Sequence, residues 1–398
     1  MDYKKLLNEK QYEAVTTGSP YVRIIAGAGS GKTRVLTYRI AYLLSEMHVT
    51  PWKVLAITFT NKVANEMKER IRQVLPEDMD WRGLSIMTFH SFCARFLRRE
   101  IHHIGYPSNF TILDEEDQEK LVKDIAVREM NLAKSDPIIK KAISYIGSQK
   151  TLGNYPQDIF IDREKFEDEK LCLKIYESYE KHLKATGNLD FDDLLLKANI
   201  ILENFEDVRE AWHQRIDHIL IDEFQDTNDV QYKLVQLLKK PSTTLYVVGD
   251  PDQTIYTWRG ANQDIILDID RRYQMETIVL DRNYRSTQTI LDTANRLISH
   301  NRKRVKKDLY TENGTGDPIR IFSAFRADDE ARWVVDQIRE LEHEKQMRNE
   351  DFSYRDVVLL YRSSYLSLPF EKALVSAQIP YKVYVDYDSI KEKKSKTF

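Results

Sequence analysis

A glycine-rich stretch near the amino terminus has the composition of a phosphate-binding loop. It reads Ala26-Gly27-Ala28-Gly29-Ser30-Gly31-Lys32-Thr33, with alanine at position 26 where the general motif has glycine. Glycines let the backbone curl so that its N–H groups point at phosphate oxygens, and the start of a following helix adds partial positive charge. Lys32 can neutralise the outer phosphates, and the Thr33 hydroxyl can bind Mg²⁺. The stretch therefore predicts a nucleoside triphosphate site that uses magnesium.

The segments on both sides of this loop supply the context that such a loop requires. An apolar run at 22–25 precedes it and predicts a buried strand. Apolar residues then recur with the spacing of an amphipathic helix, at Leu36, Ile40, Leu43, Leu44 and Met47. A glycine loop ending in Gly-Lys-Thr between a strand and a helix is specific to P-loop proteins. The alternative is a glycine-rich turn that precedes Lys-Thr by chance.

Two adjacent acids follow a second apolar run. The run at 218–221 predicts a strand, and Asp222 and Glu223 come directly after it. In phosphoryl-transfer sites, one such carboxylate binds Mg²⁺ and a second polarises the attacking water. The acids could instead belong to the start of a helix that Asp226 or Thr227 caps. Both interpretations are compatible, because that cap leaves Asp222 and Glu223 free.

Three further apolar runs end in polar clusters, at 54–57, 84–87 and 245–248. With the two runs above they make five candidate strands, most of which precede a segment of helical periodicity. This order predicts an α/β fold with a doubly wound, largely parallel sheet, whose ligands bind at the carboxyl ends of the strands.

Aromatic and cationic residues follow the same predicted edge of the sheet. They are Phe59, His90, Tyr256, Trp258 and Arg259. Aromatic faces beside a cation bind unpaired bases without reading their sequence. A lone aromatic residue more often belongs to the core, but Tyr256 and Trp258 follow a phosphate-type loop and not an alternating strand. We expect a surface for single-stranded nucleic acid, and this expectation also rests on the family resemblance given below.

The composition narrows the class of protein. The chain has 398 residues, a length typical of two or three domains. Its 60 Lys+Arg and 63 Asp+Glu give a net charge of -3, so any positive surface for nucleic acid must be local. Two distant cysteines, Cys93 and Cys172, exclude a disulfide framework and a cysteine zinc cluster. Because no apolar run is long enough to span a bilayer, we expect a cytoplasmic protein without a membrane partner.

Seven motifs in order resemble those of the superfamily-one DNA helicases of the UvrD/PcrA/Rep type. They are LNEKQ from Leu7, AGAGSGKT from Ala26, TFTNKVANEM from Thr58, TFHSF from Thr88, IDEFQDTN from Ile221, VGDPDQTIYTWRGA from Val248 and LDRNYRS from Leu280. The resemblance extends from Met1 to about Tyr384. It implies an ATP-dependent and Mg²⁺-dependent helicase of DNA repair or replication, which translocates three-prime to five-prime. Its partners would be single-stranded DNA and junctions of duplex with single strand.

The resemblance also implies roles for individual residues. Gln11 would bind adenine, which Arg34 and Tyr284 would sandwich. Lys32, Glu223, Gln253 and Arg285 would be catalytic: Glu223 would orient the attacking water, and Gln253 and Arg285 would contact the γ-phosphate. Thr33 and Asp222 would hold the metal. The remaining nucleotide contacts would come from Ala26, Gly27, Ala28, Gly29, Ser30, Gly31 and Arg70. Single-stranded DNA would contact Phe59, Asn61, His90, Tyr256, Trp258 and Arg259.

The same resemblance divides the chain into three domains. Residues 1–106 and 213–281 would form a RecA-like P-loop NTPase lobe, and residues 107–212 a helical insertion domain. Residues 282–398 would form a partial second RecA-like lobe, with strands at 319–322, 357–361 and 381–385 and a helix at 330–341. Because the last motifs of the family do not follow Tyr384, this lobe is expected to lack its carboxyl half. The alternative function is then an ATP-responsive fragment that binds single-stranded DNA without motor activity. A third interpretation is a small-molecule P-loop kinase, which gives no explanation for the segment from Tyr256 to Arg259.

Two charged segments have a structural and a functional interpretation each. Acidic residues at 190–193 could bind a metal, but a helix N-cap is the favoured interpretation. Five cations lie between 302 and 307: Arg302, Lys303, Arg304, Lys306 and Lys307. A solvated surface is the favoured interpretation here, and contact with a nucleic-acid backbone is the alternative.

Overall fold

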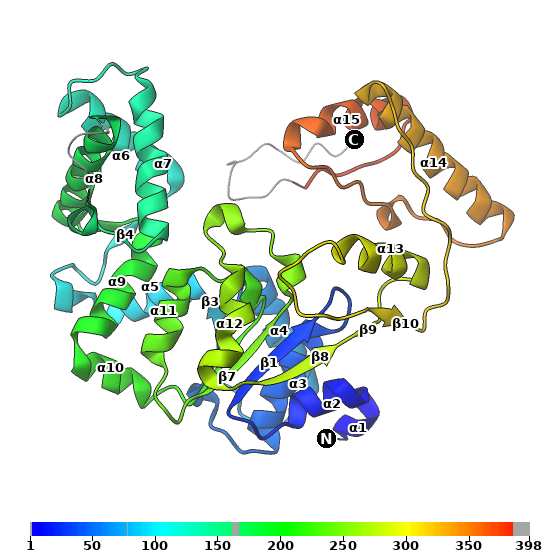
Figure 1. Cartoon of the computed structure of the whole chain (residues 1–398), viewed down its shortest axis with the longest axis horizontal. Helices are drawn as coiled ribbons and strands as arrows, with labels where there is room; N and C mark the ends of the chain where they lie inside the picture. The colour runs from blue at the N-terminus through cyan, green and yellow to red at the C-terminus, as the bar shows by residue number, and fades with distance from the viewer. Residues whose placement is uncertain (1, 78, 161–166, 385–398) are drawn as a thin grey trace. The chain divides into compact units, whose positions relative to one another are not determined.

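The computed structural model (Figure 1) describes residues 2–77, 79–160 and 167–384. The chain forms two compact units, Met1–Asp317 and Pro318–Phe398. Each unit has a hydrophobic core of its own. None of the helices in the described residues is both long enough and apolar enough to cross a membrane.

The first unit is built on a six-stranded sheet in which every strand is parallel to its neighbours, in the order β3-β2-β6-β7-β1-β8. The strands are β1 Tyr21–Ala26, β2 Val54–Thr58, β3 Ser85–Thr88, β6 His218–Ile221, β7 Thr244–Gly249 and β8 Glu276–Leu280. The predicted parallel α/β sheet is confirmed, with all five expected strands. The edge strand β8 was not predicted, because it begins with the polar residues Glu276 and Thr277 and so lacks a fully apolar signature.

Helices cover both faces of this sheet. Alternate residues of β1 enter two different cores, with Ile24 on one face and Ile25 on the other. The first face packs against α2 Glu9–Thr16, α3 Lys32–Ser45 and α4 Asn61–Val74. The second packs against α5 Phe89–Glu100, α9 Phe191–Asn204, α10 Glu206–His213, α11 Asp229–Leu238 and α12 Gln263–Tyr273. Burial on both faces explains why these strands read as continuous apolar runs and not as alternating ones.

A group of three helices has a separate core within the first unit. These helices are α6 Glu115–Arg128, α7 Pro137–Thr151 and α8 Glu167–Thr186, and Figure 1 shows them side by side. Two short strands, β4 Thr111–Ile112 and β5 Asn188–Leu189, pair in parallel next to this group: β4 precedes α6 in the chain, and β5 connects α8 to α9. The helical content expected between 107 and 212 is therefore present, while the domain boundaries stay predictions.

A buried ionic network ties α7, α8 and α9 together. The Lys150 ammonium lies 2.6 Å from Glu180, 2.7 Å from Asp190 and 3.0 Å from Asp193. Burial alone would lower the pKa of Lys150, but the three carboxylates outweigh it and hold that pKa well above its ordinary value. Asp190 is the N-cap of α9, in a reciprocal capping box with Asp193. The N-cap interpretation of Asp190 is thus confirmed, and the Lys150 ammonium lies against both Asp190 and Asp193.

The segment after the sheet returns to the phosphate-loop side of the first unit. It contains β9 Arg282–Asn283, α13 Gln288–Ile298 and β10 Tyr310–Thr311, and β9 pairs with β10 in parallel. At the other end of the chain, α1 Tyr3–Leu6 precedes α2.

As far as Tyr384, where the described residues end, the second unit contains two α-helices and extended segments that pack on them. Its helices are α14 Ala327–Met347 and α15 Ser367–Ser376, so the helix expected at 330–341 forms and is longer. Val335 and Ile338 of α14 pack with Leu374 of α15 and with Ile379.

The three strands expected in the second unit are not formed in the described residues. No strand is assigned at 319–322, 357–361 or 381–384, and Val385 lies outside the described residues. The alternating pattern is present, since Leu359 packs against the helices while Val358 and Leu360 face solvent. A strand also needs ladder hydrogen bonds to a neighbour, and an apolar pattern alone cannot supply them. The prediction of these three strands was therefore wrong.

Candidate functional site

The glycine-rich loop joins β1 to α3 at the carboxyl edge of the sheet. Gly29 and Gly31 have φ angles of 71° and 91°, in the left-handed region that glycine adopts at little cost. A Cβ atom at Gly29 would lie 2.6 Å from Asn283 Nδ2, and one at Gly31 would lie 2.9 Å from Gln11 Nε2. Gly31 is the N-cap of α3, whose first N–H groups have no acceptor within the helix. This is the backbone arrangement of an anion-binding loop.

Three predicted catalytic side chains meet beside the loop. Lys32 Nζ lies 3.0 Å from Glu223 Oε2 and donates a hydrogen bond of 3.2 Å to Gln253 Oε1. The Lys32 side chain is only 11% exposed, so little water screens its charge. The loop, the end of β6 and the turn after β7 thus contribute one side chain each to a single cluster.

The predicted metal-binding acid is buried next to this cluster. Burial and the neighbouring carboxylate of Glu223 raise the pKa of Asp222 to about 7, although Lys32 acts in the opposite direction. Asp222 Oδ1 accepts a hydrogen bond of 3.0 Å from the Glu223 N–H. Neighbouring carboxylates that raise each other's pKa favour a bound cation, and oxygen ligands suit Mg²⁺. Thr33, whose hydroxyl oxygen is the other predicted metal ligand, is the second residue of α3.

The helix that follows these acids has a different cap from the one expected. Asn228, and not Asp226 or Thr227, is the N-cap of α11, and its side chain accepts from the Gln231 N–H. A short 3₁₀ turn at Phe224–Asp226 precedes the helix, which therefore begins one or two residues later than expected. Asp222 and Glu223 therefore lie outside the cap, as both interpretations required.

The residues expected around adenine lie near the junction of α1 and α2. Gln11 is buried and its Nε2 donates a hydrogen bond of 3.1 Å to the Ser30 carbonyl. Arg34 Nη2 donates to the Leu6 carbonyl at 2.7 Å, and the Tyr284 hydroxyl accepts from Asn8 Nδ2 at 2.6 Å. The structure thus places Arg34 and Tyr284 against the same short segment.

Asn283 holds the segment after the sheet against the loop. Its Nδ2 donates to the Ala28 carbonyl at 2.6 Å, and its Oδ1 accepts from the Arg285 N–H at 2.8 Å. The Tyr284 N–H donates to the Gly29 carbonyl at 2.9 Å. Arg285 therefore lies beside the loop with its side chain exposed. Asn283 was not singled out from the sequence, because a neutral amide between arginine and tyrosine has no chemical signature.

Arg70 is a predicted nucleotide residue whose described contact lies away from the glycine-rich loop. It lies on α4, where its Nη2 is 4.0 Å from Glu66 Oε2 in an exposed i,i+4 pair. Its assignment stays a prediction.

An aromatic stack is exposed at the same edge of the sheet. The rings of Phe59 and Tyr256 are stacked with centroids 4.7 Å apart, and Trp258 lies 6.3 Å from Tyr256. The Arg259 guanidinium lies 4.7 Å from the Trp258 ring. Trp258 is 72% exposed and so is not part of the core. Phe59 follows β2 and the other three follow β7, so two loops build one surface.

His90 and Asn61 lie near this edge with partners of their own. The His90 ring is 5.1 Å from the ring of Phe191, which is exposed at the start of α9. Asn61 Oδ1 accepts a hydrogen bond of 3.1 Å from Ser91 Oγ. The sequence gives no signal for Phe191, because it stands among acids at 190–193 whose pattern indicates helix capping or metal binding.

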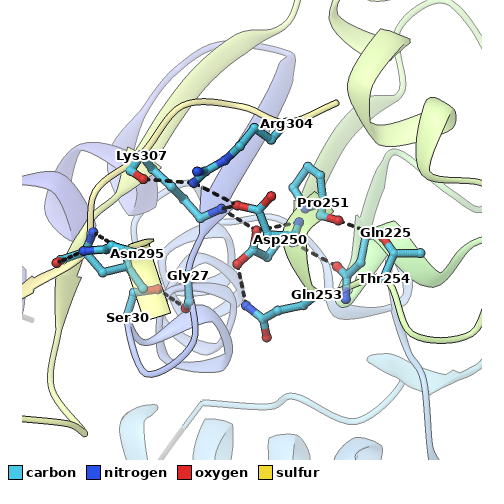
Figure 2. A network of polar contacts seen from close by, with 12 residues as sticks. Gly27, Ser30, Gln225, Asp250, Pro251, Gln253, Thr254, Asn295, Arg304 and Lys307 are labelled. Carbon is cyan, nitrogen blue, oxygen red and sulfur yellow. Dashed lines mark hydrogen bonds and ion pairs between the residues drawn. The ribbon is translucent and has the colours of Figure 1, made fainter. Parts of the chain in front are cut away.

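The cation-rich segment at 302–307 is only partly the solvated surface that was expected. Lys307 Nζ lies 2.6 Å from both Asp250 Oδ1 and Asp252 Oδ2, and Arg304 lies 3.1 Å from Asp252 (Figure 2). Arg302, Lys303 and Lys306 are exposed, as predicted. The expectation was wrong for Lys307 and Arg304, because the two carboxylates after β7 are buried and need cations to balance their charge.

Comparison with known proteins identifies the family. The UvrD/REP helicase N-terminal domain matches residues 7–274, and the UvrD-like helicase C-terminal domain matches residues 278–393. An "ATP-dependent DNA helicase PcrA" of Leuconostoc citreum is 42% identical over 94% of this chain and 49% of its own length. A "DNA helicase II" of Haemophilus influenzae is 41% identical over 96% of this chain and 52% of its own. An "ATP-dependent DNA helicase PcrA" of Staphylococcus epidermidis is 40% identical over 95% of this chain and 50% of its own length.

The chain thus spans about half the length of the curated relatives it matches. The first family model alone covers more than half of the chain, including the loop, the acid pair and the aromatic stack. The chain belongs to the UvrD/REP helicase family, in the UvrD/PcrA/Rep type of superfamily one.

Proposed function

We propose that this chain binds ATP and single-stranded DNA and works as an ATP-dependent DNA helicase that translocates three-prime to five-prime. The observation that carries the proposal is the position of one short segment. Gln253 touches Lys32 of the phosphate loop, and Tyr256, three residues later, stacks on Phe59 in the exposed aromatic surface. A movement of Gln253 at the phosphates would therefore be transmitted along three residues of the chain to Tyr256, on the surface proposed to bind bases.

The residues of the cluster fit the requirements of phosphoryl transfer. Thr33 and Asp222 would hold Mg²⁺, which when bound neutralises charge on the β- and γ-phosphates. Lys32 and the N–H groups at the start of α3 would bind the phosphate oxygens. Glu223, which Gln225 holds through a hydrogen bond of 2.9 Å, would orient the attacking water. Gln253 and Arg285 would contact the γ-phosphate.

The aromatic surface fits single-stranded DNA without a sequence preference. Phe59, Tyr256 and Trp258 offer ring faces for base stacking, and Arg259 beside Trp258 adds positive charge for the backbone. Arg259 is thus a local positive charge of the kind that nucleic-acid binding requires in a chain whose net charge is -3.

The test is ATP hydrolysis by the purified chain, with and without a single-stranded oligonucleotide, followed by separation of a duplex with a three-prime tail. Hydrolysis that the oligonucleotide stimulates, together with strand separation, supports the proposal. Binding of both ligands without turnover would instead favour an ATP-responsive DNA-binding protein. Absence of DNA affinity at low salt would contradict both.

Replacement of Trp258 by alanine should weaken binding of single-stranded DNA by about 1–3 kcal/mol, the usual contribution of one stacked base. Affinity for nucleotide in the absence of DNA should not change, because Trp258 makes no described contact with the phosphate loop. Fluorescence anisotropy with a labelled oligonucleotide measures the first quantity, and a fluorescent ATP analogue measures the second.

Trp52→Ala is the matched control for this variant. Trp52 is also exposed, but it precedes β2 and so lies at the amino edge of the sheet. Equal losses of DNA affinity in the two variants would show that Trp258 has no specific role.

A further inference from the structure

A continuous series of polar contacts connects Lys307 with the lysine of the phosphate loop. Lys307 Nζ donates to Asp250 Oδ1 at 2.6 Å (Figure 2). The other oxygen of Asp250, Oδ2, accepts a hydrogen bond of 2.5 Å from Gln253 Nε2. Gln253 Oε1 in turn accepts from Lys32 Nζ at 3.2 Å. Two side chains, those of Asp250 and Gln253, therefore separate the two lysines.

The inner part of this series is buried and balanced in charge. The side chains of Lys307, Asp250 and Asp252 are 3%, 4% and 6% exposed. Asp252 also pairs with Arg304 at 3.1 Å, so two cations face two carboxylates. Removal of one cation would leave a buried carboxylate without compensation, which is strongly unfavourable in a dry environment.

The two halves of the series come from segments far apart in the chain. Asp250 and Gln253 belong to the turn after β7, which leads on to the aromatic stack. Lys307 belongs to the connection between α13 and β10. Two residues later, the Leu309 side chain lies so close to Gly27 that a Cβ there would approach it to 2.5 Å. The connection thus contacts both the phosphate loop and the turn that carries Gln253.

The amide of Gln253 has one orientation that satisfies both of its neighbours. Its NH₂ group faces the Asp250 carboxylate, and its oxygen faces the Lys32 ammonium. Asp250 is itself held from the opposite side, by Lys307 and by the Asp252 N–H at 3.0 Å. The position of Gln253 next to Lys32 therefore depends on the anchoring of Asp250.

We propose that Lys307 is a positioning residue for ATP hydrolysis, which keeps Gln253 next to Lys32 by anchoring and neutralising Asp250. Lys307 itself touches neither phosphates nor water in this scheme. The proposal rests on the proposed function, because it assigns Gln253 to the γ-phosphate side of the same site. It explains why Lys307 is buried in the 302–307 segment, where Arg302, Lys303 and Lys306 are exposed.

The test compares Lys307→Met with Lys306→Met, which removes the same charge from the exposed neighbouring residue. For Lys307→Met we expect kcat of ATP hydrolysis to fall about 10- to 100-fold, because a misplaced group near the chemistry has effects of that order. The Kd for an ATP analogue should stay within about threefold, since the glycine loop is unchanged. Lys306→Met should match the unaltered chain, and Lys307→Arg, which keeps the charge, should recover part of the loss.

A second pair of variants separates positioning from folding. Lys307→Met combined with Asp252→Asn removes one cation and one carboxylate, so the buried charges stay balanced and thermal unfolding should approach that of the unaltered chain. Turnover should still be low, because Asp250 has lost its anchor. Normal turnover in this double variant, or in Lys307→Met alone, would overturn the proposal.

Failure of the positioning role of Lys307 can be distinguished from failure of the proposed function. If the unaltered chain shows no hydrolysis that depends on Lys32, the proposed function fails, and a double-mutant cycle in thermal unfolding still tests the contact series. Lys307→Met and Gln253→Ala should then be non-additive, because both act on Asp250. Strict additivity would overturn the positioning role independently of any turnover.

Discussion

Lys32→Ala should lower ATP turnover by at least about 100-fold, the scale on which enzymes lose activity when one preorganised electrostatic contact is removed. Lys32 supplies the only described side-chain cation that contacts both Glu223 and Gln253, at 3.0 and 3.2 Å. The affinity for ATP should fall as well, because Lys32 would bind phosphate in the ground state.

Steady-state hydrolysis with saturating oligonucleotide measures this loss, and a fluorescent ATP analogue measures the change in affinity. Lys184→Ala serves as the control, since Lys184 is exposed on α8, in the separate helical group. The fold should survive in Lys32→Ala because Glu223 is 35% exposed and can be solvated when its partner is removed. Nucleotide affinity and turnover equal to those of the unaltered chain would exclude Lys32 from the phosphate site.

Glu223→Gln should also reduce turnover, by about 10²–10⁴-fold, the usual contribution of a general base. Here the expected pattern differs from that of Lys32→Ala, because glutamine has nearly the same shape and only the charge and basicity are lost. Nucleotide affinity should therefore stay within about threefold, so that the defect lies in kcat and not in binding. Single-turnover hydrolysis combined with analogue binding separates the two.

Glu177→Gln is the matched control for this change, because Glu177 is exposed on α8. A Glu223→Gln variant that hydrolyses ATP at the normal rate would remove this residue from the role of orienting water. A loss of affinity in proportion to the loss of turnover would point instead to a role in binding.

Several features of the site were predictable because their signals are local in the chain. The strands β1, β2, β6 and β7 are buried on both faces, and this leaves short continuous apolar runs that a pattern can detect. Gly29 and Gly31 stand where the loop adopts positive φ, which favours glycine, so their spacing in the sequence predicts the loop. Asp190 caps a helix in a capping box with Asp193, which depends on a separation of three residues.

Other features depended on which distant segments meet, and no local pattern reports that. Lys307 lies among exposed cations in the sequence, yet it is buried against Asp250, which is 57 positions away. Phe191 reaches His90 only because α9 packs on α5.

The amino-acid sequence by itself determined the chemistry available to this protein: a phosphate loop, an acid pair after a strand, and aromatic residues suited to bases. The tertiary structure decided which of these groups touch. It joined Lys32, Glu223 and Gln253 in one cluster, and within the described residues it left the apolar segments at 319–322, 357–361 and 381–384 without strand partners. The physical reason is that the energy of a buried ion pair or a strand ladder belongs to two segments at once, whereas a sequence pattern describes each segment alone.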